Sequence, residues 1–276
     1  MSGRTLVGFQ GEHGAYSEMA VFQLFDRSSS EAVPYFSFRG VFEAVQNRTI
    51  DFGMVPIENA LAGAIDDNFD LLWEFEGLHI VAETQVRIEH NLIGLPGTSL
   101  GTIQKVYSHP QGLAQSRTFL ESHPEWEPVP FYDTAGSVAH VAKLGDPSLA
   151  AIASAEAARV YGMAILAAAV ESNHQNFTRF FQIALHSVPS TAKPNKASLV
   201  FATADEPGAL SKCLAVFAAH NLNMKKLESR PIQGRPWDYM FYVDVALPAA
   251  GDQFDVAFAE LKAVAKDLRL LGKYRA

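Results

Sequence analysis

The chain has 276 residues, 48% of them hydrophobic and 19% charged, which is a globular composition with enough length for a buried core. Its net charge of −8, and the lack of a basic run interleaved with aromatic residues, argue against nucleic acid as a partner. The single cysteine, Cys213, excludes an internal disulfide, and no apolar run is long enough to cross a membrane. We therefore expect a cytoplasmic protein with neither nucleic acid nor a membrane as partner.

Short apolar strands alternate with helical segments over the first two thirds of the chain. Strands are expected at residues 6–9, 33–38, 52–55, 106–107, 150–153 and 181–183. Helices are expected at residues 16–25, 41–45, 65–75, 110–120 and 156–161. This alternation predicts βαβ units around mainly parallel sheets.

A different pattern follows a segment with two prolines and no periodicity, residues 188–195, which is typical of a linker. After it, strands are expected at residues 197–202, 224–230, 239–245 and 269–275, and helices at 208–220 and 254–268. That order is βαββαβ, a ferredoxin-like unit. We therefore divide the chain into an α/β domain over residues 1–187, a linker over 188–195 and a second domain over 196–276.

Small hydroxyl residues stand at the expected starts of three helices in the first domain: Ser17, Ser108 and Thr134. Ser108 is followed by Pro110 and Gln111, which is a capping-box pattern. Most such residues only cap their helix. A helix start also offers unpaired N–H groups and partial positive charge, so three of them at the ends of strands favour an anion-binding site.

Two further segments place polar side chains at strand ends. Glu58 and Asn59 follow an apolar strand, and we interpret Glu58 as a partner of a nearby arginine and Asn59 as a ligand contact, because an amide both donates and accepts. Thr178 and Arg179 stand side by side between aromatic residues at the entry to another strand. The nine histidines show no tight metal-ligand spacing, and Cys213 lies on the apolar face of its helix, which gives a nucleophilic hydrolase little support.

The chain resembles the prephenate dehydratases, including the related arogenate dehydratases, over nearly its whole length. The segments that carry this resemblance are 11–18 (GEHGAYSE), 55–59 (VPIEN), 91–97 (NLIGLPG), 108–115 (SHPQGLAQ), 133–136 (DTAG), 151–158 (AIASAEAA) and 176–180 (NFTRF). The C-terminal domain resembles an ACT regulatory domain through segments 208–210 (GAL) and 228–231 (ESRP). One departure is Ala60, where the family usually has serine, which removes a hydroxyl from that corner of the site.

The resemblance implies an α/β fold with a two-lobed catalytic domain similar to periplasmic binding proteins, followed by the ferredoxin-like ACT domain. It implies decarboxylative dehydration of prephenate to phenylpyruvate in phenylalanine biosynthesis, a lyase reaction that needs no metal or organic cofactor. It also points to Thr178 as the catalytic donor. Arg179 either holds the pyruvyl carboxylate of the substrate or pairs with Glu58.

Further site residues follow from the same resemblance. The expected substrate contacts are Ser17, Asn59, Thr134 and Phe180. The expected effector is phenylalanine, bound where the ACT domains of two subunits meet, by residues Gly208, Ala209, Leu210, Glu228, Ser229, Arg230 and Pro231. This pairing implies a homodimer or a homotetramer.

Two alternatives stay open at this point. An arogenate dehydratase would act on the amino analogue and yield phenylalanine directly, and motif spacing does not separate a keto from an amino side chain. A protein of another class, a non-catalytic amino-acid sensor, would combine a binding-protein-like cleft with an ACT domain. The intact Thr178-Arg179-Phe180 run argues against the sensor.

Overall fold

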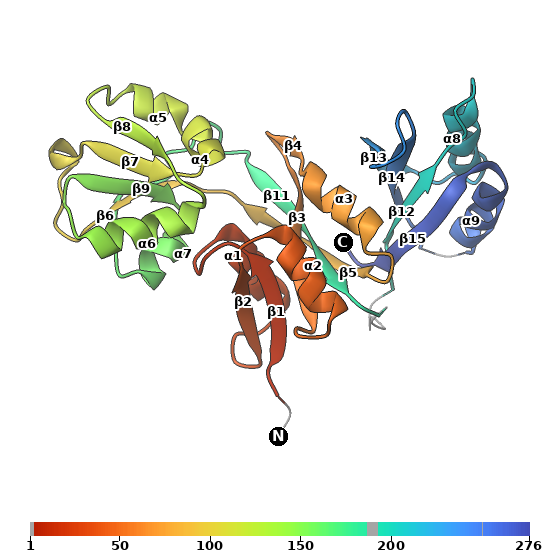
Figure 1. Ribbon diagram of the computed structural model, residues 1–276, viewed down its shortest axis with the longest axis horizontal. Coiled ribbons are helices and arrows are strands. Elements are labelled where there is room, and N and C mark those ends of the chain that lie inside the picture. Colours follow the sequence, from red (N-terminus) through yellow and green to blue (C-terminus); the bar gives the residue numbers. More distant parts are fainter. Residues whose placement is uncertain (1–2, 187–192, 250) are drawn as a thin grey trace. The chain divides into compact units, whose positions relative to one another are not determined.

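The computed structural model describes residues 3–186, 193–249 and 251–276, which form three β-sheets with helices beside them (Figure 1). The first sheet has the strand order β2-β1-β3-β11-β5, with the short β4 paired to β3. Its strands are β1 (Thr5–Gln10), β2 (Ser30–Tyr35), β3 (Phe52–Asn59), β4 (Gly63–Ala64), β5 (His79–Arg87) and β11 (Phe177–Ala184). Its helices are α1 (Tyr16–Leu24), α2 (Phe38–Gln46) and α3 (Asp66–Glu74).

The local sequence explains these elements. The middle of β3 is a run of apolar residues that is buried on both faces, as expected for a central strand of a sheet covered by helices. Along α2, Val41, Phe42 and Val45 lie on one stripe at helical spacing and are fully or almost fully buried. The parallel pairing of β1 with β2 confirms the βαβ unit expected at the start of the chain.

The chain leaves the first sheet after β5, builds a second sheet and returns as β11. The second sheet has the order β10-β6-β9-β7-β8, in which β7 runs parallel to β8 and β9, whereas β6 runs antiparallel to β9 and β10. Its strands are β6 (Asn91–Gly94), β7 (Lys105–Ser108), β8 (Glu127–Pro130), β9 (Leu149–Ala153) and β10 (Ala164–Ala167). Its helices are the 3-10 turn η1 (Leu100–Thr102), α4 (Pro110–Gln115), α5 (Arg117–Glu121), α6 (Thr134–Leu144) and α7 (Ala155–Val160).

The third sheet is antiparallel, with the order β13-β14-β12-β15. Its strands are β12 (Lys196–Ala202), β13 (Met224–Pro231), β14 (Tyr239–Ala246) and β15 (Lys266–Tyr274), and its helices are α8 (Ala209–Ala219) and α9 (Gln253–Val264). Alternate strand residues such as Leu199 and Phe201 pack on Cys213 and Leu261 of the two helices. The predicted fold class, an α/β protein of the two-lobed binding-protein type with a ferredoxin-like βαββαβ domain, is confirmed.

By contacts between residues, the chain falls into two compact units. The first comprises Met1–Val41, Met54–Gly63 and Gln85–Phe180, and the second comprises Phe42–Gly53, Ala64–Thr84 and Phe181–Ala276. The second unit joins α3 and β5 to the third sheet, since the Tyr242 hydroxyl donates to the carbonyl of Phe69 and the Lys196 ammonium lies 2.8 Å from both Glu83 carboxylate oxygens. The division at residue 187 stays a prediction, and most of the expected linker, residues 188–192, lies outside the described residues.

Several expected bounds are wrong. The helix expected over 254–268 ends at Val264, and β15 begins at Lys266, because Ala265 adopts an extended conformation and the chain turns to pair with β12. The helix expected over 110–120 is two short helices, because Ser116 leaves helical geometry. Strands β5, β6, β8 and β10 were not expected from the sequence. No helix within the described ranges combines the length and the apolar character that crossing a membrane requires.

Candidate active site

The end of β3 and the start of β11 lie side by side and bring together the residues expected at two separate strand ends. The backbone N–H of Ala60 donates to the carbonyl of Phe177 at 2.8 Å, which locks the two segments in register. Asn59 is the last residue of β3, and Thr178 is the second residue of β11. Both side chains are buried, so their hydrogen bonds are made within the protein.

The Asn59 amide makes hydrogen bonds at both ends. Its Nδ2 donates to the Oδ1 of Asn176 at 2.8 Å and to the Oγ1 of Thr178 at 2.9 Å. Its Oδ1 accepts from the backbone N–H groups of Leu61 and Ala62, at 3.0 and 2.9 Å. With both amide hydrogens and its oxygen engaged, Asn59 acts here as a positioning residue more than as the ligand contact expected from the sequence.

Thr178 receives a hydrogen bond from Asn59, and this decides what its hydroxyl offers. A threonine hydroxyl has one hydrogen to donate and two lone pairs that accept. Because the Nδ2 of Asn59 occupies one lone pair, the Thr178 hydrogen points away from Asn59 and is available as a donor. The arrangement therefore suits donation to an oxygen that gains negative charge.

Arg179 and Phe180 differ from Thr178 in what their side chains contact. The Nη2 of Arg179 lies 3.3 Å from a carboxylate oxygen of Glu58, so the structure contains the Arg179–Glu58 pair, one of the two roles open to Arg179. Phe180 is 1% exposed and packs in the core, because β11 is buried on both faces from Phe180 onward. Its contact with the substrate stays a prediction.

At the start of α4 the hydroxyl is not used as the sequence suggested. Ser108 ends β7 and donates to the carbonyl of Ile152, so His109 is the N-cap of α4 and accepts from the N–H of Gln111. Burial lowers the pKa of His109. The predicted capping box at Ser108 is therefore wrong, because a neighbouring strand takes its hydroxyl.

The start of α6 already holds a carboxylate. Asp133 is its N-cap, and its Oδ1 accepts from the N–H of Gly136 at 2.6 Å. Burial raises the pKa of the Asp133 carboxyl. Thr134 is the first residue of this helix and lies beside Gly112, so the structure does bring the starts of α4 and α6 together. A substrate carboxylate at α6 would meet the carboxylate of Asp133.

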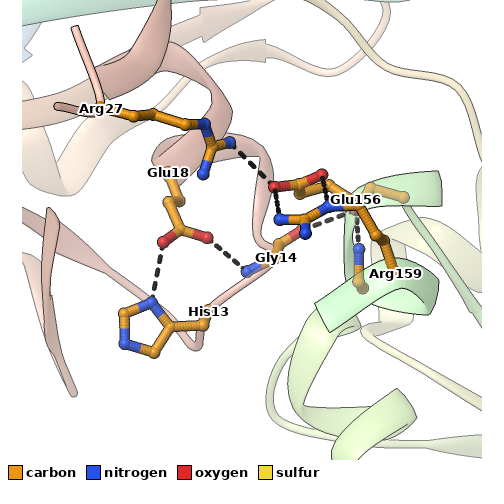
Figure 2. A network of polar contacts seen from close by, with 8 residues as sticks. His13, Gly14, Glu18, Arg27, Glu156 and Arg159 are labelled. Atoms are coloured by element: carbon orange, nitrogen blue, oxygen red, sulfur yellow. Dashed lines mark hydrogen bonds and ion pairs between the residues drawn. The ribbon is translucent and has the colours of Figure 1, made fainter. Parts of the chain in front are cut away.

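Ser17 lies in the first turn of α1, whose N-cap, Ala15, provides no side-chain cap. The turn before this helix is held by Glu18, which accepts from the N–H of Gly14 at 2.6 Å and lies 2.8 Å from the Nδ1 of His13 (Figure 2). Gly14 has a φ of +89°, and a Cβ there would stand 2.6 Å from the Cα of Ala157. Only glycine fits this close approach.

The turn before α1 and the residues that follow α1 are each attached to α7 by a contact. Ser154, the N-cap of α7, donates to the carbonyl of Gly14 at 2.6 Å. Arg27 lies 2.8 Å from Glu156, which also binds Arg159, as Figure 2 shows. Hydrogen bonding from Arg159 lowers the pKa of Glu156. Sequence patterns gave no sign of the contacts of Ser154 with Gly14 and of Arg27 with Glu156, because these partners are more than a hundred residues apart.

A buried histidine stands where the chain passes from the first sheet to the second. His90 has its Nδ1 3.0 Å from the hydroxyl of Tyr16 and its Nε2 2.9 Å from the Oε1 of Gln115. Its backbone N–H donates to the buried carboxylate of Glu171. Burial lowers the pKa of His90. The sequence pattern around His90 gave no sign of these partners.

The expected effector residues lie in two elements: residues 208–210 at the start of α8, and residues 228–231 at the end of the edge strand β13. Gly208 precedes α8 in a left-handed conformation with a φ of +83°, Ala209 is buried, and Leu210 packs on the domain core. On β13, Ser229 and Pro231 are exposed. Pro231 is the last β13 residue in register with β14, which a proline on an edge strand allows.

The other two residues of the ESRP segment form ion pairs within the chain. The guanidinium of Arg230 lies 2.6 Å from Asp66 and 3.0 Å from Asp70, both on α3. Glu228 lies 3.1 Å from Lys226. Arg230 therefore joins the third sheet to α3, a role that the sequence did not indicate. The described part of the chain contains no group of three or more His, Cys, Asp and Glu side chains that could hold a metal ion.

Comparison with known proteins places this geometry in a family context. The model of the family described as "PDT: Prephenate dehydratase" matches residues 7–188. Arogenate dehydratase 2 of Petunia hybrida is 39% identical over 98% of this chain and 72% of its own length. The bifunctional chorismate mutase/prephenate dehydratase of Escherichia coli K12 is 36% identical over 97% of this chain and 70% of its own length.

Two solved structures have the same fold over nearly all of the chain. Prephenate dehydratase from Arthrobacter aurescens in complex with L-Phe is 29% identical, with a TM-score of 0.90 over 99% of this chain and 90% of that one. A protein described as GqqA, a novel type of quorum quenching acylase, is 33% identical, with a TM-score of 0.87 over 98% of both chains.

Proposed function

Since the chain belongs to the prephenate dehydratase family, we propose that Thr178 is its catalytic hydrogen-bond donor and that the ends of β3 and β11 hold the reacting part of the substrate. The family's activity is that of a carbon–oxygen lyase, in which prephenate loses water and carbon dioxide and becomes phenylpyruvate. The observation that carries the proposal is the hydrogen bond that Thr178 accepts from Asn59, which directs its own hydrogen elsewhere.

The chemistry of the reaction fits a donor of this kind. The hydroxyl that leaves the ring gains negative charge as its bond to carbon breaks, and it needs a proton or a strong hydrogen bond. A threonine hydroxyl is too weak an acid to give up its proton fully, so Thr178 stabilises the departing oxygen by hydrogen bonding. One well-placed donor contributes roughly 2.7–4 kcal/mol to such a step. Loss of the ring carboxylate as carbon dioxide then restores aromaticity.

The charge of the site supports the same assignment. Thr178, Asn59 and Asn176 form a neutral cluster, so none of these three side chains forms an ion pair with the ring carboxylate. A cation bound there would stabilise the carboxylate in the ground state and slow its departure. For the pyruvyl carboxylate we propose Ser17 and the uncapped first turn of α1. Thr134 is a weaker candidate for this carboxylate, because Asp133 already occupies its helix start.

The direct test is an ultraviolet assay for phenylpyruvate released from prephenate by the purified chain. Arogenate, with detection of phenylalanine, is assayed in parallel, because relatives with both names match this chain. We expect turnover of prephenate. Binding of prephenate without product would instead support the non-catalytic sensor, and turnover of arogenate alone would support the arogenate dehydratase.

A second candidate activity comes from one comparison. The quorum quenching acylase matches 98% of this chain at 33% identity, and the Arthrobacter aurescens dehydratase matches 99% of it at 29% identity. Release of the free amine from an acylated quorum-sensing signal would support this activity. If Thr178→Val abolished dehydration but not acyl release, the two activities would use different groups.

We also propose that phenylalanine regulates the enzyme through the third sheet. The solved relative in complex with L-Phe supports this effector class. Ser229 of β13 is exposed, and through β14 it is in register with the end of β12, from which the chain runs to Gly208. Arg230 is engaged with α3, so we assign it to transmission more than to ligand binding. A homodimer or homotetramer and a cytoplasmic location stay predictions, and sedimentation with and without phenylalanine tests the first.

A further inference from the structure

Asn176 is the buried partner that decides which way the Asn59 amide faces. It lies immediately before β11, it is 0% exposed, and its own carbonyl accepts from the N–H of Ile88 at 2.8 Å. Its Oδ1 accepts from the Nδ2 of Asn59 at 2.8 Å. Its Nδ2 has no hydrogen-bond partner among the described residues, so this side chain acts only as a hydrogen-bond acceptor there.

The direction of the Asn59 amide controls the hydroxyl of Thr178. If the amide turned over, its oxygen would face Thr178 and accept the hydroxyl hydrogen. Two features oppose that turn: the acceptor of Asn176 on one side, and the N–H groups of Leu61 and Ala62 on the other. A buried donor or acceptor left without a partner is costly, so each feature favours the observed direction.

We propose that Asn176 and Asn59 form a relay that holds the Thr178 hydroxyl as a donor, and that Asn176 is a positioning residue for the dehydration. This inference rests on the proposed role of Thr178 and adds the residue that sets the direction of its hydrogen. Asn176 acts through Asn59 and makes no contact with the substrate. The Oδ1 of Asn176 matters because it accepts from the same Asn59 Nδ2 that donates to Thr178.

The test is a double-mutant cycle of Asn176→Leu and Thr178→Val, read by kcat and KM on prephenate. Asn176→Leu removes the acceptor and keeps the branched shape of the side chain, and we expect a roughly tenfold fall in kcat with little change in KM. In the Thr178→Val background, which lacks the hydroxyl, the same change is expected to alter kcat by less than about twofold. Asn176→Asp keeps an acceptor in the same place and is expected to recover most of the lost kcat.

The outcomes separate this inference from the proposed function. An equal fall in kcat in both backgrounds would overturn the relay, because a purely structural residue acts whether or not the hydroxyl is present. Near-normal turnover by Thr178→Val alone would instead remove Thr178 from the mechanism. If circular dichroism shows that Asn176→Leu does not fold, Asn176→Ser takes its place, since serine fits the site and is too short to reach Asn59.

Discussion

The end of β3 and the β13 edge of the third sheet are held by different kinds of polar contact. The first holds Asn59, Asn176 and Thr178 in a buried, neutral network of hydrogen bonds. The second holds Arg230 in a half-exposed cluster of ion pairs with two aspartates. Neutral amides fix the direction of a hydrogen, whereas ion pairs attach one element to another. We therefore propose that the first region carries out catalysis and that the second transmits the binding of phenylalanine.

The largest effect is expected from Asn59→Asp, which keeps the shape and reverses the polarity. The new carboxylate has no hydrogen to give, so Thr178 would donate to it and no longer to the substrate. We expect kcat to fall roughly a hundredfold, about the loss of one transition-state donor. The exposed Asn47→Asp is the control for the chemical change. Unchanged turnover in a folded Asn59→Asp would show that the amide does not orient Thr178.

The second region is tested by Arg230→Ala. Its guanidinium is 19% exposed and binds two carboxylates, and removing a hydrogen bond to a charged group costs about 1.5–3 kcal/mol of folding free energy. Arg235→Ala is the matched control, because Arg235 pairs with Asp267 at a more exposed place, where an ion pair contributes little to stability. Urea unfolding measures both.

The same pair of variants tests transmission. We expect Arg230→Ala to keep turnover and to lose most of the response to phenylalanine, whereas Arg235→Ala keeps the response. Equal responses in the two variants would mean that the contact with α3 only stabilises the fold.

A smaller effect is expected from Arg179→Lys. Because Arg179 pairs with Glu58, lysine can keep the ion pair, and we expect kcat and KM to stay within about threefold of wild type, which is less than 1 kcal/mol. If Arg179 instead held the pyruvyl carboxylate through both guanidinium nitrogens, lysine would raise KM by tenfold or more. Steady-state kinetics on prephenate decides between these roles, and Glu58→Gln serves as the partner control.

The smallest effect is the pH dependence of stability that comes from His90. Burial lowers its folded-state pKa, so the unfolded chain takes up a proton first as the pH falls. This contribution to stability is therefore complete above about pH 6.5 and is lost as the pH falls from there toward the folded-state pKa. We expect His90→Gln to flatten the fall of the urea midpoint between neutral and mildly acid pH. If the urea midpoint of His90→Gln fell with pH as steeply as that of wild type, the pH dependence of stability would come from other groups, such as His109.

The sequence predicted the elements well where hydrophobic periodicity is strong, and it predicted which strand ends carry Asn59 and Thr178. It did not predict their contact, since they are 119 residues apart and meet only through the pairing of β3 with β11. It failed at the start of α4, because a capping pattern does not reveal that a neighbouring strand takes the hydroxyl of Ser108. The contact of Phe180 with the substrate stays a prediction, and its burial within β11 depends on tertiary packing that the sequence pattern does not show.

The most direct test of the account is the single-turnover rate of Thr178→Val on prephenate, measured beside Thr178→Ser. Valine keeps the shape of threonine and removes only the hydroxyl, and serine keeps the hydroxyl. The account predicts a fall of roughly a hundredfold or more for valine, with substrate binding retained, and a rate for serine much closer to wild type. A valine variant that converts prephenate at nearly the wild-type rate would contradict it.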